Sequence, residues 1–424
     1  MSATAPTRLE EAVTGGAIRS VNFFNGRLLT GDDLRREQEA ERARLARLGQ
    51  AAGEGIGYGL EVAEALAGSN AARPVVTVAP GLAVARSGLA LELPARTDVS
   101  LLREHPPPGA EPGGLFADCQ PFASGTYTAG AGVYLLTIGP TRTSEGLAAV
   151  SGLTNDPAPC NTALSVEAVK FRLIRLALPP SQLTDVAHLR NHVAHQFFGT
   201  DALAGFVADP FGPVLREYGL LDVLRNGLVT DDDVPLAVLS WTADAGIRWV
   251  DLWAVRRRLT RMHPLDDWAV FSDDRRRSEG EAMFLQFQDE LEELRLTASP
   301  ETIKARDQFS MLPPVGLLHI GQGAERSFAY QRFFDGIPIR SEPAVIEGAR
   351  VGDVVAASMV LSPIDLAKSE LIWLYLVHQN VEPTTTGTAA RHRYVLFTNG
   401  QADYRGDARF ELSYWNYSNY AEIG

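Results

Sequence analysis

The sequence predicts an α+β fold: a mainly β, shell-like N-terminal domain with one long helix, a helical middle, and a β-sandwich-like C-terminal domain. Three observations predict it. Apolar residues alternate with period two over much of residues 75–178, they recur at helical spacing over 273–296, and period-two patterning returns after Pro313. A chain of 424 residues, 45% hydrophobic and 21% charged, has the length and composition of several globular domains. We divide it into a flexible arm (1–19), a β-rich shell-like domain (20–180), a mixed helical region with a returning β-hairpin (181–310) and a C-terminal β domain (311–424).

The shell-like domain begins with an apolar stretch, Val21–Phe24, that has the composition of a short strand. Thr30 then stands three residues before Asp33, which is the spacing of a capping box. This pattern predicts a helix over residues 32–48 that ends at Gly49.

The apolar stripe of this helix consists only of Leu34, Leu45 and Leu48, while arginines and glutamates cover the rest. So narrow a stripe on a long helix predicts that the leucines are buried against the N-terminal sheet or a neighbouring subunit. We expect the flanking charges to form ion pairs, many of them between chains. Together with Phe23 and Phe24, the three leucines are the candidate interface residues.

Strands and turns follow the helix. A run of alternating glycines, Gly53 to Gly59, follows the helix and precedes strands, which is the reverse of the order in a phosphate-binding loop. We therefore interpret it as a close crossing of helix and strand, where side chains would clash. Strands are expected at Val75–Ala79, Leu82–Leu93 with a fold near Gly88, Val133–Ile138 and Val166–Leu178.

The middle and C-terminal parts alternate between helical and strand patterns. A hairpin at 234–250 is expected to return to the first sheet. Helices are expected at His188–Phe198, Pro213–Leu224, Trp253–Met262 and Asp273–Leu296, and the five C-terminal strands at Val315–Ile320, Val351–Leu361, Leu371–His378, Arg393–Thr398 and Arg409–Tyr417.

The charge balance bears on partners and location. Lys plus Arg number 39 against 52 Asp plus Glu, a net charge of −13, so nucleic-acid binding is not expected. We interpret the triplets Arg256–Arg258 and Arg275–Arg277 as solvated or paired helix faces. The first twenty residues lack a continuous apolar segment, so we expect no signal peptide. The longest uncharged run, from Cys119 to Arg142, is broken by glycines and prolines, so we expect no membrane span. Cys119 and Cys160 lie in Pro- and Gly-rich sequence, where they are either two free thiols or a pair.

Catalytic signatures are missing from the sequence, which contains no G-x-S-x-G, P-loop or H-E-x-x-H motif. We therefore expect no enzymatic activity and no cofactor. Two patterns leave alternatives open. The spacing puts three histidines on one face of a helix: His188, His192 and His195. They are either ligands of a metal ion or simply a polar helix face. Aromatic residues gather near the C-terminus: Tyr414, Trp415 and Tyr417. They either form a surface that binds a ligand or another subunit, or they belong to an edge strand that packs on its own sheet.

One stretch of sequence resembles a known family. Asn22–Leu34, the charged helix with Glu37-Gln38, and Gly57–Val62 resemble a baseplate- and tail-fibre-associated family of contractile injection systems, which are phage-tail-like particles. Val76–Val84 and Val234–Leu239 continue the likeness. The arrangement of the domains is also distantly similar to the type VI secretion baseplate trimer protein, in which a shell domain grips the baseplate and a helical stalk trimerises.

The resemblance implies a structural, non-enzymatic component at the periphery of a baseplate, which attaches a fibre, cage or receptor-binding element. It further implies other baseplate or tail subunits as partners, a homo-oligomer of three- or six-fold symmetry, and a location in the cytoplasm or with a released or membrane-docked particle. Two alternatives remain: a receptor- or glycan-binding module in the C-terminal β domain, and a metal-dependent hydrolase that uses the three histidines.

Overall fold

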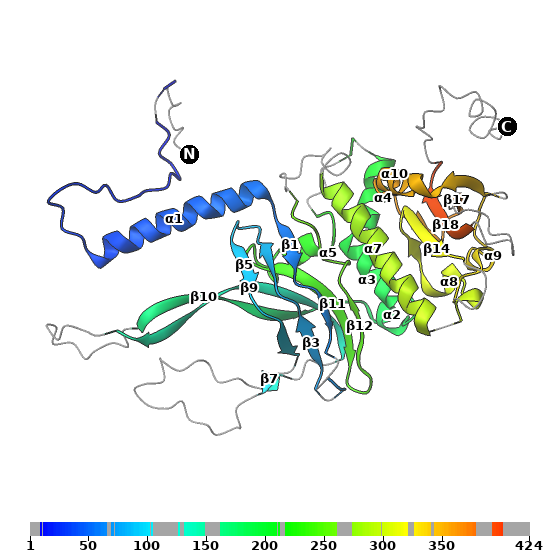
Figure 1. Cartoon of the computed structure of the whole chain (residues 1–424), viewed down its shortest axis with the longest axis horizontal. Helices are drawn as coiled ribbons and strands as arrows, with labels where there is room; N and C mark the ends of the chain where they lie inside the picture. Colours follow the sequence, from blue (N-terminus) through cyan, green and yellow to red (C-terminus); the bar gives the residue numbers. More distant parts are fainter. Residues whose placement is uncertain are drawn as a thin grey trace, which may run out of the picture.

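Figure 1 shows the computed structural model, an elongated molecule in which sheets and helices are packed in layers. The fold is α+β, as the sequence predicts. The structure describes residues 9–10, 12–65, 69–71, 73–101, 103–104, 126–127, 131–148, 162–209, 211–212, 217–260, 274–297, 299–320, 326–340, 343–378 and 392–401.

The N-terminal part consists of one long helix and three sheets. Two small sheets have the strand orders β1-β4-β5 and β2-β3-β6, and a larger one has the order β10-β9-β11-β12. A short pair, β7–β8, is separate. The bounds are α1 Gly31–Ala52, β1 Gly55–Gly59, β2 Val62–Glu64, β3 Val75–Val78, β4 Gly81–Val84, β5 Ala90–Leu93, β6 Thr97–Ser100, β7 Arg103–Glu104, β8 Thr126–Tyr127, β9 Gly132–Leu147, β10 Thr162–Arg175, β11 Val234–Thr242 and β12 Gly246–Asp251.

The larger sheet is buried on both faces near its centre. Its strand β11 pairs with β9, so the expected return of the hairpin to the first sheet is confirmed. Tyr134 and Leu136 on one face share a core with the small sheets, whereas Val133 and Leu135 on the other face pack against helices. This alternation follows from the period of a strand, which points successive side chains to opposite faces.

The helices of the middle cover the second face of this sheet. They are α2 Pro180–Thr184, α3 Leu189–Phe197, α4 Thr200–Ala208, α5 Leu220–Leu224 and α7 Asp274–Thr297. Helix α7 lies between the large sheet and the C-terminal part (Figure 1). Its Met283 packs in the core beneath the sheet, and its Phe287 and Leu291 pack in the C-terminal core. Helix α7 therefore contributes side chains to two cores of this chain.

The C-terminal part has a four-stranded sheet with the order β14-β18-β17-β15, in which only β15 and β17 are parallel. Helix α10 makes the crossover that a parallel pair requires. The bounds are η2 Pro300–Thr302, α8 Ala305–Gln308, β13 Met311–Leu312, β14 Val315–His319, α9 Tyr330–Phe333, β15 Ala344–Glu347, η3 Gly348–Arg350, α10 Val351–Ser358, β16 Ile364–Asp365, β17 Ile372–His378 and β18 His392–Asn399.

Several expected elements differ from the structure. Residues 351–358 form a helix instead of a strand, because Val351, Val354 and Val355 recur at helical spacing and cover the sheet. In the described residues the C-terminal part is thus a sheet packed by helices, and not the expected sandwich of two sheets. Residues 21–24 are extended but join no sheet, and α1 continues past Gly49 to Ala52. Residues 253–260 form turns and two bridges to Glu54 and Ile56 instead of a helix.

Gly280 marks the closest contact between α7 and the end of α10. A Cβ atom built on Gly280 would lie 1.9 Å from the carbonyl oxygen of Met359, which is backbone and cannot easily move away. The sequence signal of this contact is a glycine inside a strongly helical pattern, where alanine would otherwise be favoured by about 1 kcal/mol.

We predict that Gly280→Ala lowers the free energy of unfolding, although the same change in an open helix raises it. The matched control is Gly205→Ala in α4, where no heavy atom lies within 4 Å of the added Cβ. Urea denaturation of both variants measures the difference. Equal stabilisation of the two variants would contradict the close packing of α7 against α10.

Candidate functional site

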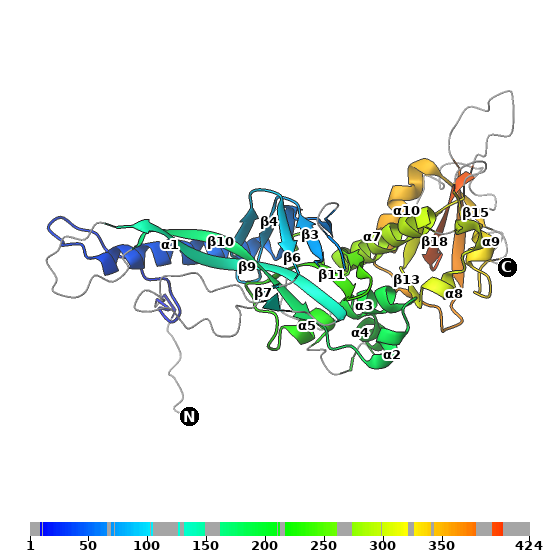
Figure 2. The same ribbon diagram turned by 90° about the horizontal axis from the view of Figure 1, so that it is seen from below.

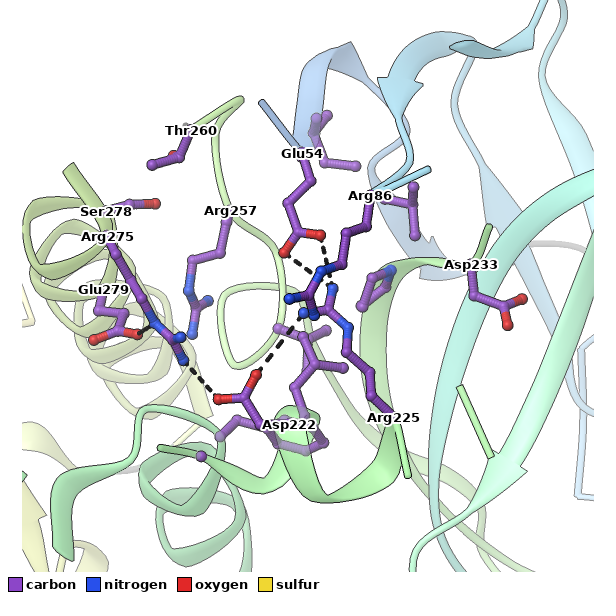
Figure 3. A pocket seen from close by; sticks show the side chains of 18 of the residues that line it. Glu54, Arg86, Asp222, Arg225, Asp233, Arg257, Thr260, Arg275, Ser278 and Glu279 are labelled. Carbon is purple, nitrogen blue, oxygen red and sulfur yellow. Dashed lines mark hydrogen bonds and ion pairs between the residues drawn. The ribbon is translucent and has the colours of Figure 1, made fainter. Parts of the chain in front are cut away.

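A chain of ion pairs joins three elements around a small cavity (Figure 3). Arg225 of the α5 C-cap donates to both carboxylate oxygens of Glu54 at 3.0 and 2.9 Å, and its second nitrogen lies 3.8 Å from Asp222. Arg275 of α7 donates to Asp222 and to Glu279, each at 2.9 Å. This row of ion pairs therefore connects Glu54, which directly precedes β1, with helix α5 and helix α7.

The pKa values of the paired groups favour the ionised forms of Asp222 and Arg275. Burial raises the pKa of Asp222, but Arg275 and the N–H of Tyr218 lower it further, so the pKa lies below its usual value. Burial also lowers the pKa of Arg275, while Glu279 and Asp222 raise it to a net value above the usual one. Each group thus holds its neighbour in the charged form.

Arg257 lines the same cavity as these ion pairs. Among the described residues, no carboxylate lies within salt-bridge distance of its guanidinium. Its guanidinium donates to the carbonyl oxygens of Trp253, Ala254 and Arg256, and it stacks 5.1 Å from the ring centroid of Phe198. Burial lowers its pKa to about 10. The guanidinium thus holds the turn after β12 in place of a regular hydrogen-bond ladder.

The cavity itself has little room for chemistry. Its volume is about 70 Å3, space for a few water molecules, whereas ligand pockets usually measure some hundreds of Å3. Its one hydroxyl nucleophile with a buried oxygen, Ser278, has no hydrogen-bond partner within the described residues. Among the described residues that line the cavity there is no histidine. We therefore interpret this site as a junction that fixes α7 against the N-terminal sheets.

A second buried polar network attaches α7 to the large sheet. Asp251, at the end of β12, is 1% exposed and accepts hydrogen bonds from Arg190 of α3 at 3.2 Å and from Gln286 of α7 at 3.1 Å. Gln286 also donates to Glu290, and Arg190 donates to Glu293 at 2.6 Å. One arginine thus faces several carboxylates, and burial raises the pKa of Glu290 to about 7.

The two arginine triplets agree only in part with the expected solvated or paired helix faces, since Arg275 lies on α7 and pairs with Asp222 and Glu279, whereas Arg256 and Arg276 are buried. Arg256 is 8% exposed and donates to the carbonyl oxygens of Gly59 and Leu60, so it is neither solvated nor on a helix. Arg276 is 2% exposed and donates to the carbonyl oxygens of Val360 and Leu361 after α10. Since a guanidinium carries five donors, these side chains serve as hydrogen-bond donors to irregular backbone, a role without a signal in the sequence.

The three histidines line one cavity of about 540 Å3 between α3 and the C-terminal part. Their ring nitrogens have different surroundings. His188 lies 2.9 Å from Asp185 and 3.0 Å from the carbonyl oxygen of Arg306, and the Nδ1 of His195 lies 2.9 Å from the hydroxyl of Thr200. Burial lowers the pKa of His195 to about 3. The buried Nδ1 of His192 has no partner among the described residues.

These surroundings give no support to the metal hypothesis. In the part of the chain that the structure describes, no three His, Cys, Asp or Glu side chains form a group that could hold a metal ion. Burial lowers the pKa of His188, but the Arg306 carbonyl and the Asp185 carboxylate together raise it above its usual value. The helix spacing predicted one common face for the three rings, and all three line the same cavity, but spacing could not specify their partners.

Helix α1 has one covered face and one bare face. The arm covers the first: the N–H of Val21 donates to Glu37, Arg47 donates to the carbonyl oxygen of Gly16, and Arg27 pairs with Asp33 at 2.7 Å. The capping box of Thr30 with Asp33 is present, as expected. On this face residues 33, 37, 40, 43, 46 and 49 are buried or half-buried.

The candidate interface residues lie on the bare side. Leu34, Leu45 and Leu48 are 52%, 58% and 68% exposed, so the expectation that this chain's own sheet buries them is wrong. Phe23 and Phe24 of the arm are also exposed. Eight large apolar side chains are exposed between residues 13 and 48: Val13, Phe23, Phe24, Leu28, Leu29, Leu34, Leu45 and Leu48.

Other candidate residues cannot be placed. Tyr414, Trp415 and Tyr417, and the two cysteines Cys119 and Cys160, lie outside the described residues. Among the described helices, none is both long and apolar enough to cross a bilayer.

Comparisons with known proteins give a distant likeness to a solved structure. No protein-family model matches the chain, and no curated protein matches it. Among solved structures, the chain is similar to one titled "Crystal structure of TssK", a type VI secretion baseplate protein. The identity is 11%, the match covers 91% of this chain and 93% of that chain, and the TM-score is 0.21. A TM-score this low does not establish a common fold, so the function is argued below from this chain's own residues.

We predict that Asp222→Ala lowers the free energy of unfolding by roughly 3–5 kcal/mol, because it leaves two buried arginines short of a partner. The matched control is Arg332→Ala, which removes a surface pair with Asp335 and costs at most about 1 kcal/mol. Denaturant titration of the purified variants measures both. A loss below 1 kcal/mol for Asp222→Ala would show that the junction does not hold α7.

Glu290 makes stability depend on pH. Between the ordinary carboxyl pKa of 4.5 and about 7, folded Glu290 keeps a proton that the unfolded chain has lost, so its contribution to stability falls as the pH rises. We predict that Glu290→Gln becomes progressively more stable than the unmodified protein from pH 5 to pH 8, as measured by urea denaturation.

The control for this experiment is Glu292→Gln on the same helix. Arg295 lowers the pKa of Glu292, so this carboxylate is ionised throughout the same range and its substitution has an effect independent of pH. A difference for Glu290→Gln that stays constant from pH 5 to pH 8 contradicts the raised pKa.

Proposed function

We propose that the protein is a structural, non-enzymatic subunit of a multi-protein particle, and that it joins this particle through α1 and the arm before it. The observation that carries the proposal is the bare face of α1. A 22-residue helix buries only Asp33 and Ala40, while Leu34, Leu45 and Leu48 lie in solvent. Contiguous exposed apolar side chains of this kind mark protein interfaces.

The position of α1 supports this proposal. The helix extends away from the body of the molecule, beside the long β9–β10 ribbon (Figure 2). Strand β9 pairs with β11 only as far as Ile138, and beyond that point the ribbon has two strands. A two-stranded ribbon is marginally stable in water by itself, so we expect a neighbouring subunit to pack here as well.

The kind of particle follows from the sequence resemblance. Asn22–Leu34 and Gly57–Val62, which resemble the contractile injection family, lie at the two ends of α1. We therefore propose a contractile, phage-tail-like particle, with this subunit at the periphery of the baseplate, where it attaches a fibre, cage or receptor-binding element. Assembly in the cytoplasm belongs to the same proposal.

Leu45→Asp tests the proposal in cells that produce the particle. We predict that this variant is lost from sedimented particles by at least tenfold, because a buried carboxylate at the interface would lack a partner. Arg42→Ala removes only an exposed ion pair with Glu167 and is expected to change the salt sensitivity of incorporation. Quantitative immunoblotting of the particle fraction is the measurement.

The matched control is Leu371→Asp, at a leucine that is 47% exposed near β17. It is expected to leave both folding and incorporation unchanged. Normal incorporation of Leu45→Asp, with an unchanged melting temperature, would falsify the assignment of α1 to assembly.

A further inference from the structure

We infer that two copies of this chain pair through their α1 helices in antiparallel orientation, about a two-fold axis, a contact that differs from the three- or six-fold symmetry that the sequence resemblance implies. This inference rests on the proposed function, since it names one partner of the surface assigned there to assembly. It is carried by the spacing of the exposed residues on α1 and by the distribution of charge along the helix.

The bare face of α1 has the spacing of a coiled-coil seam. Leu34, Gln38, Glu41, Leu45, Leu48 and Ala52 are separated by alternating steps of four and three residues, and all six are exposed. This is the a/d repeat of a heptad, which brings its side chains onto one stripe that faces a second helix. The arm contacts the other side of the helix, and the turn at Gly88 packs closely against Ala46 and Gly49, so the seam is the surface that remains for a partner.

Charge divides the helix into two halves of opposite sign. The first half, residues 31–41, has five carboxylates and two arginines and therefore a net charge of −3: Asp32, Asp33, Glu37, Glu39, Glu41, Arg35 and Arg36. The second half, residues 42–52, has three arginines and no carboxylate, a net charge of +3: Arg42, Arg44 and Arg47. Asp33 is already paired with Arg27 of the arm at 2.7 Å, and without this carboxylate the first half still has a net charge of −2.

This division selects the orientation and the partner. In an antiparallel pair of identical helices, each acidic half faces the basic half of the other copy. In a parallel pair or trimer, halves of like charge face one another, which is unfavourable. A second copy of the chain thus satisfies both halves at once, and the contact is isologous, as two-fold symmetry requires.

The seam also indicates the register. In antiparallel coiled coils an a position faces a d position, and two registers pair leucine with leucine in two layers: Leu34 opposite Leu45, or Leu45 opposite Leu48. The second register would set the basic halves of the two copies against each other, so the charges select Leu34 opposite Leu45 of the second copy. Gln38 then faces Glu41 of the second copy, so the two polar residues of the seam can hydrogen-bond to each other. In this register the bodies of the two copies lie at opposite ends of the helix pair, because α1 joins the body at its C-terminal end (Figure 1).

Disulfide trapping in the full-length chain tests the orientation. Leu34→Cys and Leu45→Cys are made separately, in a background with Cys119→Ser and Cys160→Ser, and are oxidised alone and mixed. In the antiparallel pair, Leu34 of one copy lies about 16 Å along the axis from Leu34 of the other, beyond the reach of a disulfide, which needs Cα atoms within about 7 Å. We expect each variant alone to stay uncrosslinked and the mixture to form covalent dimers.

Sedimentation equilibrium tests the association itself. The unmodified chain is expected to dimerise, with a dissociation constant that rises at least tenfold from 50 mM to 1 M salt, because the charged halves are exposed and therefore screened. Leu45→Asp is expected to sediment as a monomer, and Leu371→Asp as the dimer. Circular dichroism of each variant separates loss of pairing from loss of folding.

The outcomes distinguish this inference from the proposed function. A monomer at every concentration, or covalent dimers of either cysteine variant alone, overturns the antiparallel pairing. If the chain is a monomer while Leu45→Asp still abolishes incorporation into particles, α1 docks on a different subunit and the proposed function stands. If the chain dimerises as inferred but Leu45→Asp is incorporated normally, the pairing stands and the assembly role of α1 fails.

Discussion

The carboxylate of Asp251 is the point on which the arrangement of the molecule depends. It closes the turn after β12 through the N–H of Ala254, and it receives one hydrogen bond from α3 and one from α7. Helix α7 in turn supplies Met283 to the core beneath the large sheet and Phe287 to the C-terminal core. Because a buried carboxylate is costly unless several donors surround it, these elements have one mutual arrangement in which its bonds are satisfied.

Buried arginines extend this principle along the interior. Arg256 and Arg276 donate to carbonyl oxygens in segments that have no regular ladder, and Arg225 and Arg275 alternate with carboxylates across the junction. Such ion pairs add little net stability compared with apolar packing, but they tolerate few other geometries. The ion pairs of the junction therefore fix the orientation of α7 relative to the N-terminal sheets.

The two ends of the molecule contrast in packing. Around α7, phenylalanines such as Phe309, Phe333 and Phe397 are almost completely buried. At the other end, α1 and the β9–β10 ribbon extend from the body with little core of their own (Figure 2). A rigid body with an extended, amphipathic attachment suits a subunit that must hold its shape while it binds its neighbours.

The sequence alone determined features that depend on residues close together in the chain. The capping box at Thr30, the long helix α7 and the strands of the large sheet follow from local spacing, and so do the narrow leucine stripe of α1 and the common helix face of the three histidines. Spacing could not tell which partner covers a stripe, so the sequence left open whether the chain's own sheet or a neighbouring subunit buries Leu34, Leu45 and Leu48, and the structure excludes the sheet. Nor could it separate strand from helix at residues 351–358, where a short valine-rich run fits both periods. The arginine network was decided only by the tertiary structure, because the burial of Arg256 and Arg276, and the carbonyl oxygens that they reach, depend on contacts between segments separated by more than eighty residues in the chain.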